Sequence, residues 1–117
     1  MSRVANEFPN RAPNRVPANA TDRDEQILSV IRSLREGEVV SYGDIAHDAG
    51  FPRLSRQVGH LLAGATEPLP WWRVVTSAGR LVPGAEGEQA TLLRAEGVLC
   101  TDRRVRTARF GRFSPRS

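Results

Sequence analysis

Residues 41–63 read SYGDIAHDAGFPRLSRQVGHLLA and predict two short helices joined by a turn. Ser41 stands three residues before Asp44, the spacing of a capping box, so a helix is expected to begin there. Gly50 ends that helix, and Pro52 favours the start of the next one. Two short helices joined by a glycine-containing turn indicate a helix-turn-helix, although this pattern alone has low specificity.

Helical patterns continue on both sides of this stretch. Upstream, apolar residues recur at helical spacing from Ile27 and predict an amphipathic helix that begins at Thr21 and ends at Gly37. Downstream, residues 86–96 predict a further helix, with Gly97 as its stop. The sequence therefore predicts a mainly α fold with four helices.

A small β-hairpin is expected between the third and fourth helices. Residues 72–75 favour a short strand because they end in two valines. Residues 77–79, Ser-Ala-Gly, favour a turn that brings Leu81 and Val82 back beside that strand.

The length of 117 residues suits one small domain with tails. Residues 1–20 are rich in Pro, Asn, Ala and Arg without apolar periodicity, and we expect a disordered arm. The domain is expected at residues 21–100. Residues 101–117 carry six arginines and one aspartate and are expected to form a basic tail.

The net charge is +4, and all 17 basic residues are arginine. Arginine suits phosphate groups and base edges, but a GC-rich genome produces the same composition. Residues 53–80 contain four arginines and one acidic residue, Glu67. This local positive charge indicates a polyanion-binding surface more specifically than the net charge does.

Several classes of protein are disfavoured by composition. No apolar run is long enough for a bilayer, and the N-terminus lacks the pattern of a signal peptide, so a cytoplasmic protein is expected. Cys100 is the single cysteine, which excludes an internal disulfide and a cysteine zinc cluster. His47 and His60 lack the spacing of a metal site. We expect no metal and no cofactor.

Residues 70–75 read Pro-Trp-Trp-Arg-Val-Val. This segment resembles the active-site segment of the O6-alkylguanine-DNA alkyltransferases, Pro-Cys-His-Arg-Val. It resembles more closely the alkyltransferase-like proteins, in which tryptophan replaces the reactive cysteine. Residues 40–46 are similar to the family's Ser-Tyr-Gly-x-Ile-Ala segment and residues 55–59 to its Arg-x-Val-Gly helix. Two downstream motifs, at residues 77–79 and 92–97, follow in the same order, so the resemblance covers residues 22–100.

The resemblance implies a winged helix-turn-helix that binds the DNA minor groove and flips a damaged guanine into a pocket. Arg56 would fill the gap left in the base stack, and Tyr42 would press on the phosphate backbone. Physical chemistry agrees with these roles, because a base must leave the duplex to enter an enclosed site and an inserted side chain must replace the lost stacking. Arg73 and Glu96 match the family's structural arginine and acid. The lesion pocket would be formed by Pro70, Trp71, Trp72 and Val74, with Trp72 largely structural.

The departures from the transferase pattern predict a protein that is not an enzyme. Trp71 replaces the thiol, and Trp72 replaces the histidine that would make the thiol nucleophilic. We therefore expect a monomeric sensor of O6-alkylguanine in double-stranded DNA, which marks lesions for nucleotide excision repair proteins. The alternative is a winged-helix DNA-binding module or transcription regulator without lesion specificity. Residual enzyme activity is disfavoured by the missing thiol. The loop between Arg56 and Trp71 is about two residues shorter than the family pattern, which puts the shape of the pocket in question.

Overall fold

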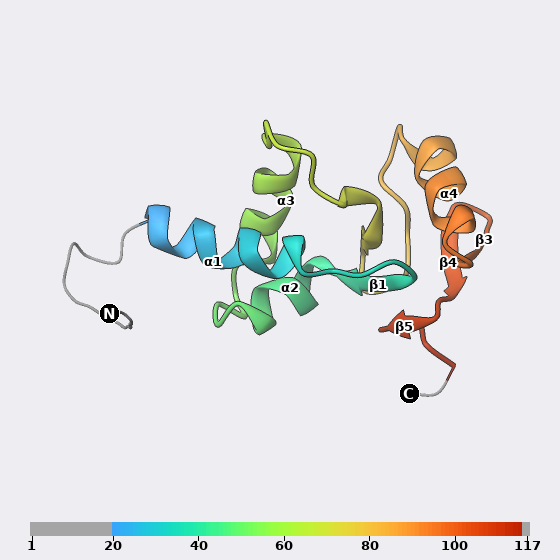
Figure 1. Ribbon diagram of the computed structural model, residues 1–117, viewed down its shortest axis with the longest axis horizontal. Helices are drawn as coiled ribbons and strands as arrows, with labels where there is room; N and C mark the ends of the chain where they lie inside the picture. The colour runs from blue at the N-terminus through green and yellow to red at the C-terminus, as the bar shows by residue number, and fades with distance from the viewer. Residues whose placement is uncertain (1–19, 116–117) are drawn as a thin grey trace.

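The computed structural model describes residues 20–115. The arm expected at residues 1–20 lies outside the described residues except for Ala20, which begins the first helix. The elements in chain order are α1 (Ala20–Arg32), β1 (Glu38–Ser41), α2 (Tyr42–Asp48), α3 (Ser55–Ala63), the 3-10 helix η1 (Trp71–Arg73), β2 (Val74–Val75), α4 (Glu86–Ala95), β3 (Leu99–Thr101), β4 (Arg104–Thr107) and β5 (Phe110–Gly111) (Figure 1). Four α-helices and short strands within this range confirm the mainly α fold. No helix in this range is long and apolar enough to cross a membrane.

The helix-turn-helix is formed by α2 and α3. Ser41 caps α2: its Oγ accepts a hydrogen bond from the Asp44 backbone N–H at 3.0 Å, while the Asp44 carboxylate accepts one from the Ser41 N–H at 3.0 Å. This is the predicted capping box. Gly50, with φ +93°, ends the helix, because the left-handed conformation allows the N–H of Phe51 to reach the Ala46 carbonyl at 2.8 Å.

Two predicted helix boundaries differ from the structure. The helix expected from Pro52 begins at Ser55, because Leu54 donates a turn hydrogen bond to the Phe51 carbonyl and its backbone is not helical. The first helix was expected to continue to Gly37 but ends at Arg32.

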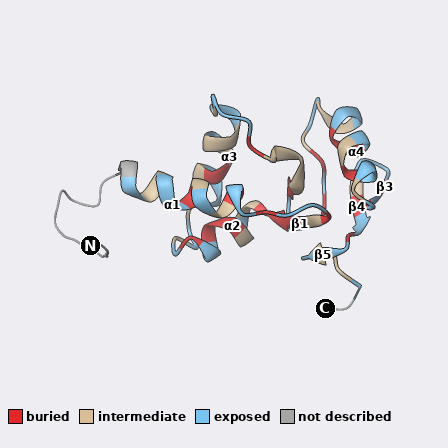
Figure 2. Cartoon of the chain, viewed as in Figure 1, coloured by how far each residue is buried: buried red, intermediate tan, exposed pale blue. Residues whose placement is uncertain are grey.

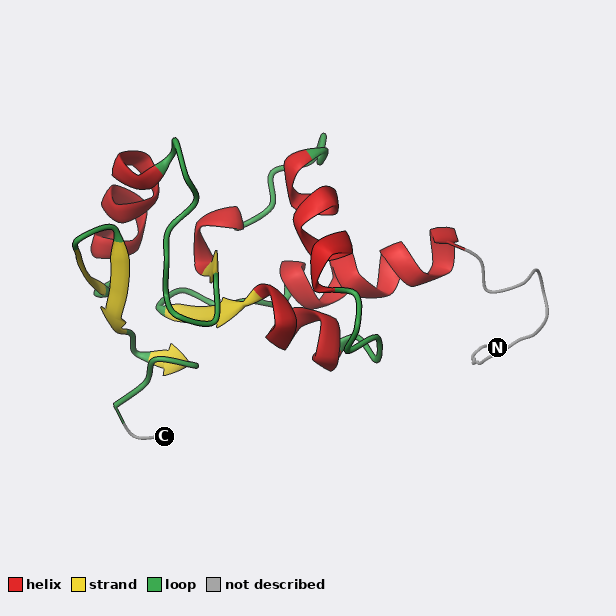
Figure 3. Ribbon diagram, turned by 180° about the vertical axis from the view of Figure 1, so that it is seen from behind, coloured by secondary structure: helices red, strands yellow, loops and turns green. Residues whose placement is uncertain are grey.

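A small parallel sheet separates two hydrophobic cores. In this sheet β1 lies between β2 and β5 and runs parallel to both. Side chains alternate across a strand, so Val40 and Val74 enter the core formed with α1, α2 and α3, whereas Val39 and Val75 enter the core formed with α4 and the β3–β4 hairpin. Figure 3 shows the two groups of elements on opposite sides of the central strand. Buried residues run along β1 and continue on both sides of it (Figure 2).

The predicted β-hairpin at residues 72–82 is wrong in position. Of the strand expected at residues 72–75, Val74 and Val75 form β2, which pairs with β1, whereas Trp72 and Arg73 belong to a 3-10 turn because Glu96 holds both of their side chains. Residues 76–79 do form a turn, but the chain then pairs elsewhere: Arg80 bridges Arg104 in an antiparallel arrangement. The hairpin of this fold is β3–β4, at Leu99–Thr101 and Arg104–Thr107.

The folded region extends past residue 100. Phe110 and Gly111 form β5 and pair with β1, and Phe113 packs against the second core. Arg112 donates two hydrogen bonds of 2.9 Å to the Asp44 carboxylate of α2. Gly111 has φ +89°, and a Cβ atom there would clash with the Val39 carbonyl, so β1 and β5 approach at a distance that only glycine allows. The segment expected as a basic tail is thus folded onto the domain as far as residue 115.

Candidate nucleic-acid interface

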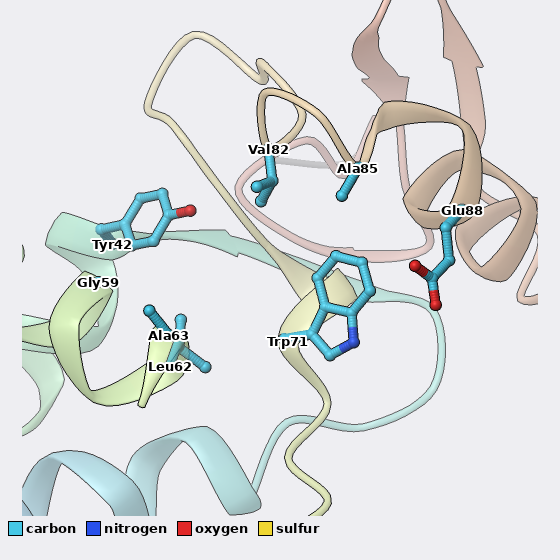
Figure 4. A pocket seen from close by; sticks show the side chains of 8 residues that line it. All are labelled: Tyr42, Gly59, Leu62, Ala63, Trp71, Val82, Ala85 and Glu88. Carbon is cyan, nitrogen blue, oxygen red and sulfur yellow. The ribbon is translucent and has the colours of Figure 1, made fainter. Parts of the chain in front are cut away.

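A pocket of about 300 Å³ lies between the helix-turn-helix and the start of α4. This volume is at the lower end of the range for small-molecule sites. Figure 4 shows Tyr42 and α3 on one side, Glu88 of α4 on the other, and Trp71 between them. The lining residues are Tyr42, Gly59, Leu62, Ala63, Trp71, Val82, Ala85 and Glu88.

Tyr42 owes its position to the capped start of α2, where it is the first helical residue. A Cβ atom at Gly59 would lie 3.9 Å from the Tyr42 ring, an ordinary van der Waals distance, so the ring packs beside α3 at this position. Burial raises the pKa of Tyr42 above its ordinary value. The phenol is therefore neutral at pH 7, and its hydroxyl can donate or accept a hydrogen bond in the pocket.

Trp71 supplies the broad apolar wall of the pocket. It is the first residue of η1, and its ring lies edge-on to Trp72, with the ring centroids 6.3 Å apart and an interplanar angle of 88°. Within residues 20–115 its indole N–H has no hydrogen-bond partner. The side chain therefore offers both a flat apolar face and a free donor to a bound group.

Trp72 and Arg73 do not line this pocket and are held by Glu96. The Arg73 guanidinium donates to the Glu96 carboxylate at 3.0 and 2.6 Å and to the Leu34 carbonyl at 2.9 Å. Trp72 Nε1 and the Gly37 backbone N–H each donate to the same carboxylate at 2.9 Å. Burial would raise the pKa of Glu96, but these hydrogen bonds hold it below its ordinary value.

The other expected pocket residues do not line the cavity. Val74 is fully buried in the core beside α1, α2 and α3. Pro70 precedes η1, and its carbonyl accepts the Arg73 backbone N–H at 3.1 Å. Of the residues that the sequence predicted for the pocket or for base flipping, the structure brings Tyr42 and Trp71 together there.

Arg56 lies in the first turn of α3 and does not itself line the pocket. It is exposed and has no ion pair or hydrogen bond through its side chain with any residue in the described range. Residues three and four positions apart share a helix face, so Arg56 lies one turn before Gly59 and two turns before Ala63 on the side of α3 that faces the pocket. An unpaired guanidinium thus stands on the helix face that leads to the cavity.

Gln89 links two segments that line the pocket and was not predicted from the sequence. Its side chain is completely buried, and its amide donates to the carbonyls of Trp72 and Val74 at 3.1 and 3.2 Å. Its Oε1 accepts the Val82 backbone N–H at 2.7 Å. Gln89 therefore joins the segment that carries Trp71 to the loop that carries Val82. The one signal for it in the sequence was a polar residue beside Ala90, on the apolar face of the predicted helix.

The chain offers little for metal or thiol chemistry within the described range. No group of three or more His, Cys, Asp or Glu side chains there is arranged to hold a metal ion. Cys100 lies in β3 and is buried in the second core, away from the lining of the pocket. Burial raises the pKa of its thiol above the ordinary value, which favours the unreactive protonated form.

Comparison with known proteins relates the whole arrangement to one family. The family model described as "6-O-methylguanine DNA methyltransferase, DNA binding domain" matches residues 22–98. A Vibrio parahaemolyticus protein named "DNA base-flipping protein" is 40% identical over 77 residues, which are 62% of this chain and 77% of that protein. "Alkyltransferase-like protein 1" of Schizosaccharomyces pombe is 30% identical over 79 residues, which are 62% of this chain and 73% of that protein.

A solved structure agrees with these sequence matches. It is described as S. pombe Atl1 in complex with damaged DNA containing O6-carboxymethylguanine. This chain resembles it with a TM-score of 0.62 and 28% identity, over 69% of this chain and 81% of the other. The fold of this chain is thus similar to that of a protein that is solved with damaged DNA.

Proposed function

This chain belongs to the family of the 6-O-methylguanine DNA methyltransferase DNA-binding domain, and we propose that it is a sensor that binds O6-alkylguanine in duplex DNA without repairing it. The observation that carries the proposal is the pocket lined by Tyr42 and Trp71, on the side of α3 that bears Arg56. A base cannot reach such a pocket from inside a duplex, so binding requires the nucleotide to leave the stack.

The residues of the pocket suit a flipped, alkylated purine. The indole face of Trp71 offers a stacking surface, and the apolar lining excludes water from an alkyl group. The free indole N–H and the Tyr42 hydroxyl supply hydrogen-bond groups for the polar edge of the base. Arg56 would occupy the position that the nucleotide leaves, where a guanidinium can stack on neighbouring bases.

The absence of repair chemistry follows from the residues at positions 71 and 72. Alkyl transfer needs a thiolate in the pocket, and the lining holds Trp71 and no cysteine. Trp72, in the position expected for the activating histidine, donates its N–H to Glu96 and offers no base. A protein that binds a lesion and leaves it unchanged must pass it to other proteins, and we propose nucleotide excision repair proteins as those partners.

The test is the affinity for one duplex with and without a single O6-methylguanine, measured by fluorescence anisotropy at fixed salt. A sensor binds the modified duplex more tightly, because a weakened base pair lowers the cost of flipping. Equal affinities would contradict lesion recognition and would favour a DNA-binding module without lesion specificity.

A further inference from the structure

The pocket has an uneven distribution of charge. Glu88 is the only charged residue of the eight that line it in the described chain. It is exposed in the first turn of α4 and has no ion pair or hydrogen bond through its side chain with any residue in positions 20–115. The carboxylate lies across the cavity from Tyr42 (Figure 4). An unpaired negative charge thus faces the space that a bound group would enter.

No positive group among the eight residues that line the pocket cancels that charge. Tyr42 is a neutral phenol, and no arginine lines the pocket in the described residues. The start of α4 carries the positive end of a helix dipole, but Glu86 and Glu88 both lie in its first turn and offset it. Glu86 is engaged by the backbone N–H of Gly84 at 3.0 Å. The pocket is therefore apolar with a net negative charge.

We infer that the pocket selects among O6-alkyl groups by their charge: it accepts neutral or cationic groups and disfavours anionic ones. This inference rests on the proposed function, because it concerns which lesion that same pocket takes. A carboxylate on the adduct would meet the Glu88 carboxylate in a partly desolvated cavity, where like charges repel more strongly than in water. An ammonium on the adduct would meet a free acceptor. Glu88 thus acts as a specificity residue through repulsion of the wrong ligand.

Two adducts of similar size and opposite charge test the inference. Duplexes that differ only in O6-carboxymethylguanine or O6-(2-aminoethyl)guanine are titrated with the full chain, and the ratio of their affinities is compared between wild type and Glu88→Gln. Because solvent partly screens an exposed carboxylate, the preference for the aminoethyl adduct should fall by about three- to tenfold in Glu88→Gln. An unchanged ratio would overturn the inference.

The matched control is Glu36→Gln. Glu36 is exposed, lies outside the pocket, and its substitution changes the net charge by the same amount. The ratio should keep its wild-type value in this variant, and an equal loss in both variants would assign the effect to overall charge and overturn the inference. A duplex with O6-methylguanine distinguishes failure of the charge selection from failure of the proposed function. If wild type binds O6-methylguanine more tightly than guanine and the affinity ratio of the two charged adducts does not change in Glu88→Gln, only the inference of charge selection fails. If wild type shows no preference for O6-methylguanine over guanine, the proposed function fails as well.

Discussion

Arg56 differs from most arginines of this domain in its lack of partners. Ion pairs hold Arg32, Arg73 and Arg112, whereas Arg53 and Arg56 extend from the region where α3 begins without an ion pair to any described residue. Only Arg56 lies within the helix, on the side that carries the pocket residues. Arg53 and Arg56 can therefore be compared to distinguish a phosphate contact from a side chain that inserts into the base stack.

Arg56→Ala should weaken binding to a duplex with O6-methylguanine far more than binding to the intact duplex. The expected loss on the lesion is about 1–3 kcal/mol, because one stacking group is removed from the position that the flipped base leaves. Arg53→Ala is the control and should weaken both duplexes by the same factor, as a phosphate contact does. Titrations of both duplexes with both variants measure this. A uniform loss in Arg56→Ala would show that Arg56 is an ordinary phosphate contact.

Trp71→Cys should fail to transfer a methyl group from radiolabelled O6-methylguanine DNA to the protein. The new thiol would lie in the pocket without a neighbouring base, and the carboxylate of Glu88 disfavours a second negative charge there. Wild type should also remain unlabelled, since its one thiol, Cys100, is buried. The double variant Trp71→Cys, Trp72→His tests whether a base restores the reaction. Label on the single variant would show that the surrounding site is still competent.

At the scale of elements, Glu96 joins the end of α4 to two segments that are distant in sequence. Its carboxylate accepts hydrogen bonds from the Gly37 backbone N–H before β1 and from two residues of η1. Arg73 also donates a hydrogen bond to the Leu34 carbonyl, which follows α1. Removal of one partner of a buried ion pair leaves the other uncompensated. The position of Trp71 depends on this network through its neighbour Trp72.

Glu96→Gln should lower the free energy of unfolding by about 3 kcal/mol at pH 7, because the half-buried Arg73 would lose its counter-charge. Urea titrations followed by circular dichroism measure the effect. The folded-state pKa of Glu96 lies below its unfolded value, so the stabilisation is present above the unfolded pKa and is lost as the pH falls through the folded pKa. The difference between wild type and variant should therefore shrink as the pH falls into that range. A difference that does not change with pH would contradict the ionic origin of the effect.

At the scale of the whole molecule, the C-terminal strands belong to the fold. The second core includes Val105 and Ala108, and β5 completes the sheet beside β1. Deletion of residues 101–117 should therefore unfold or strongly destabilise the domain, because it removes apolar packing on one side of the sheet. Thermal unfolding followed by circular dichroism checks this. A truncated chain with an unchanged melting temperature would show that the core around α4 does not depend on these strands.

The contribution of positive charge near the C-terminal strands to DNA binding is better tested by substitution than by deletion. Arg80 and Arg103 are exposed without an ion pair in the described chain, and the bridge between Arg80 and Arg104 places them in one region of the surface. In the double variant Arg80→Gln, Arg103→Gln, we expect weaker binding to intact and modified duplexes alike. The slope of log affinity against log salt should decrease by about 0.9 for each phosphate that the variant no longer neutralises. Selective weakening for the modified duplex would instead place lesion reading in this region.

The sequence by itself determined the local elements and the order of motifs. Some signals act over only a few residues and can therefore be identified without a structure. They are the Ser41–Asp44 capping box, the Gly50 stop and the apolar spacing of α1 and α4. The motifs indicated Trp71 as a pocket residue and Tyr42 as a contact to the phosphate backbone. Both line the pocket in the structure, and their roles on DNA stay predictions. Family membership was predicted from the same motifs and confirmed by the match over residues 22–98.

Tertiary structure alone decided the strand partners and the walls of the pocket. Residues 72–75 favour a strand locally, but only Val74 and Val75 form one, because the hydrogen bonds from Trp72 and Arg73 to Glu96 hold those two residues in a 3-10 turn. Val82 and Glu88 line the pocket because Gln89 holds their segment against the backbone of η1 and β2. Such contacts join residues that are far apart in sequence. Their pairing depends on how the two cores pack across β1, and this packing cannot be predicted from any local pattern of residues.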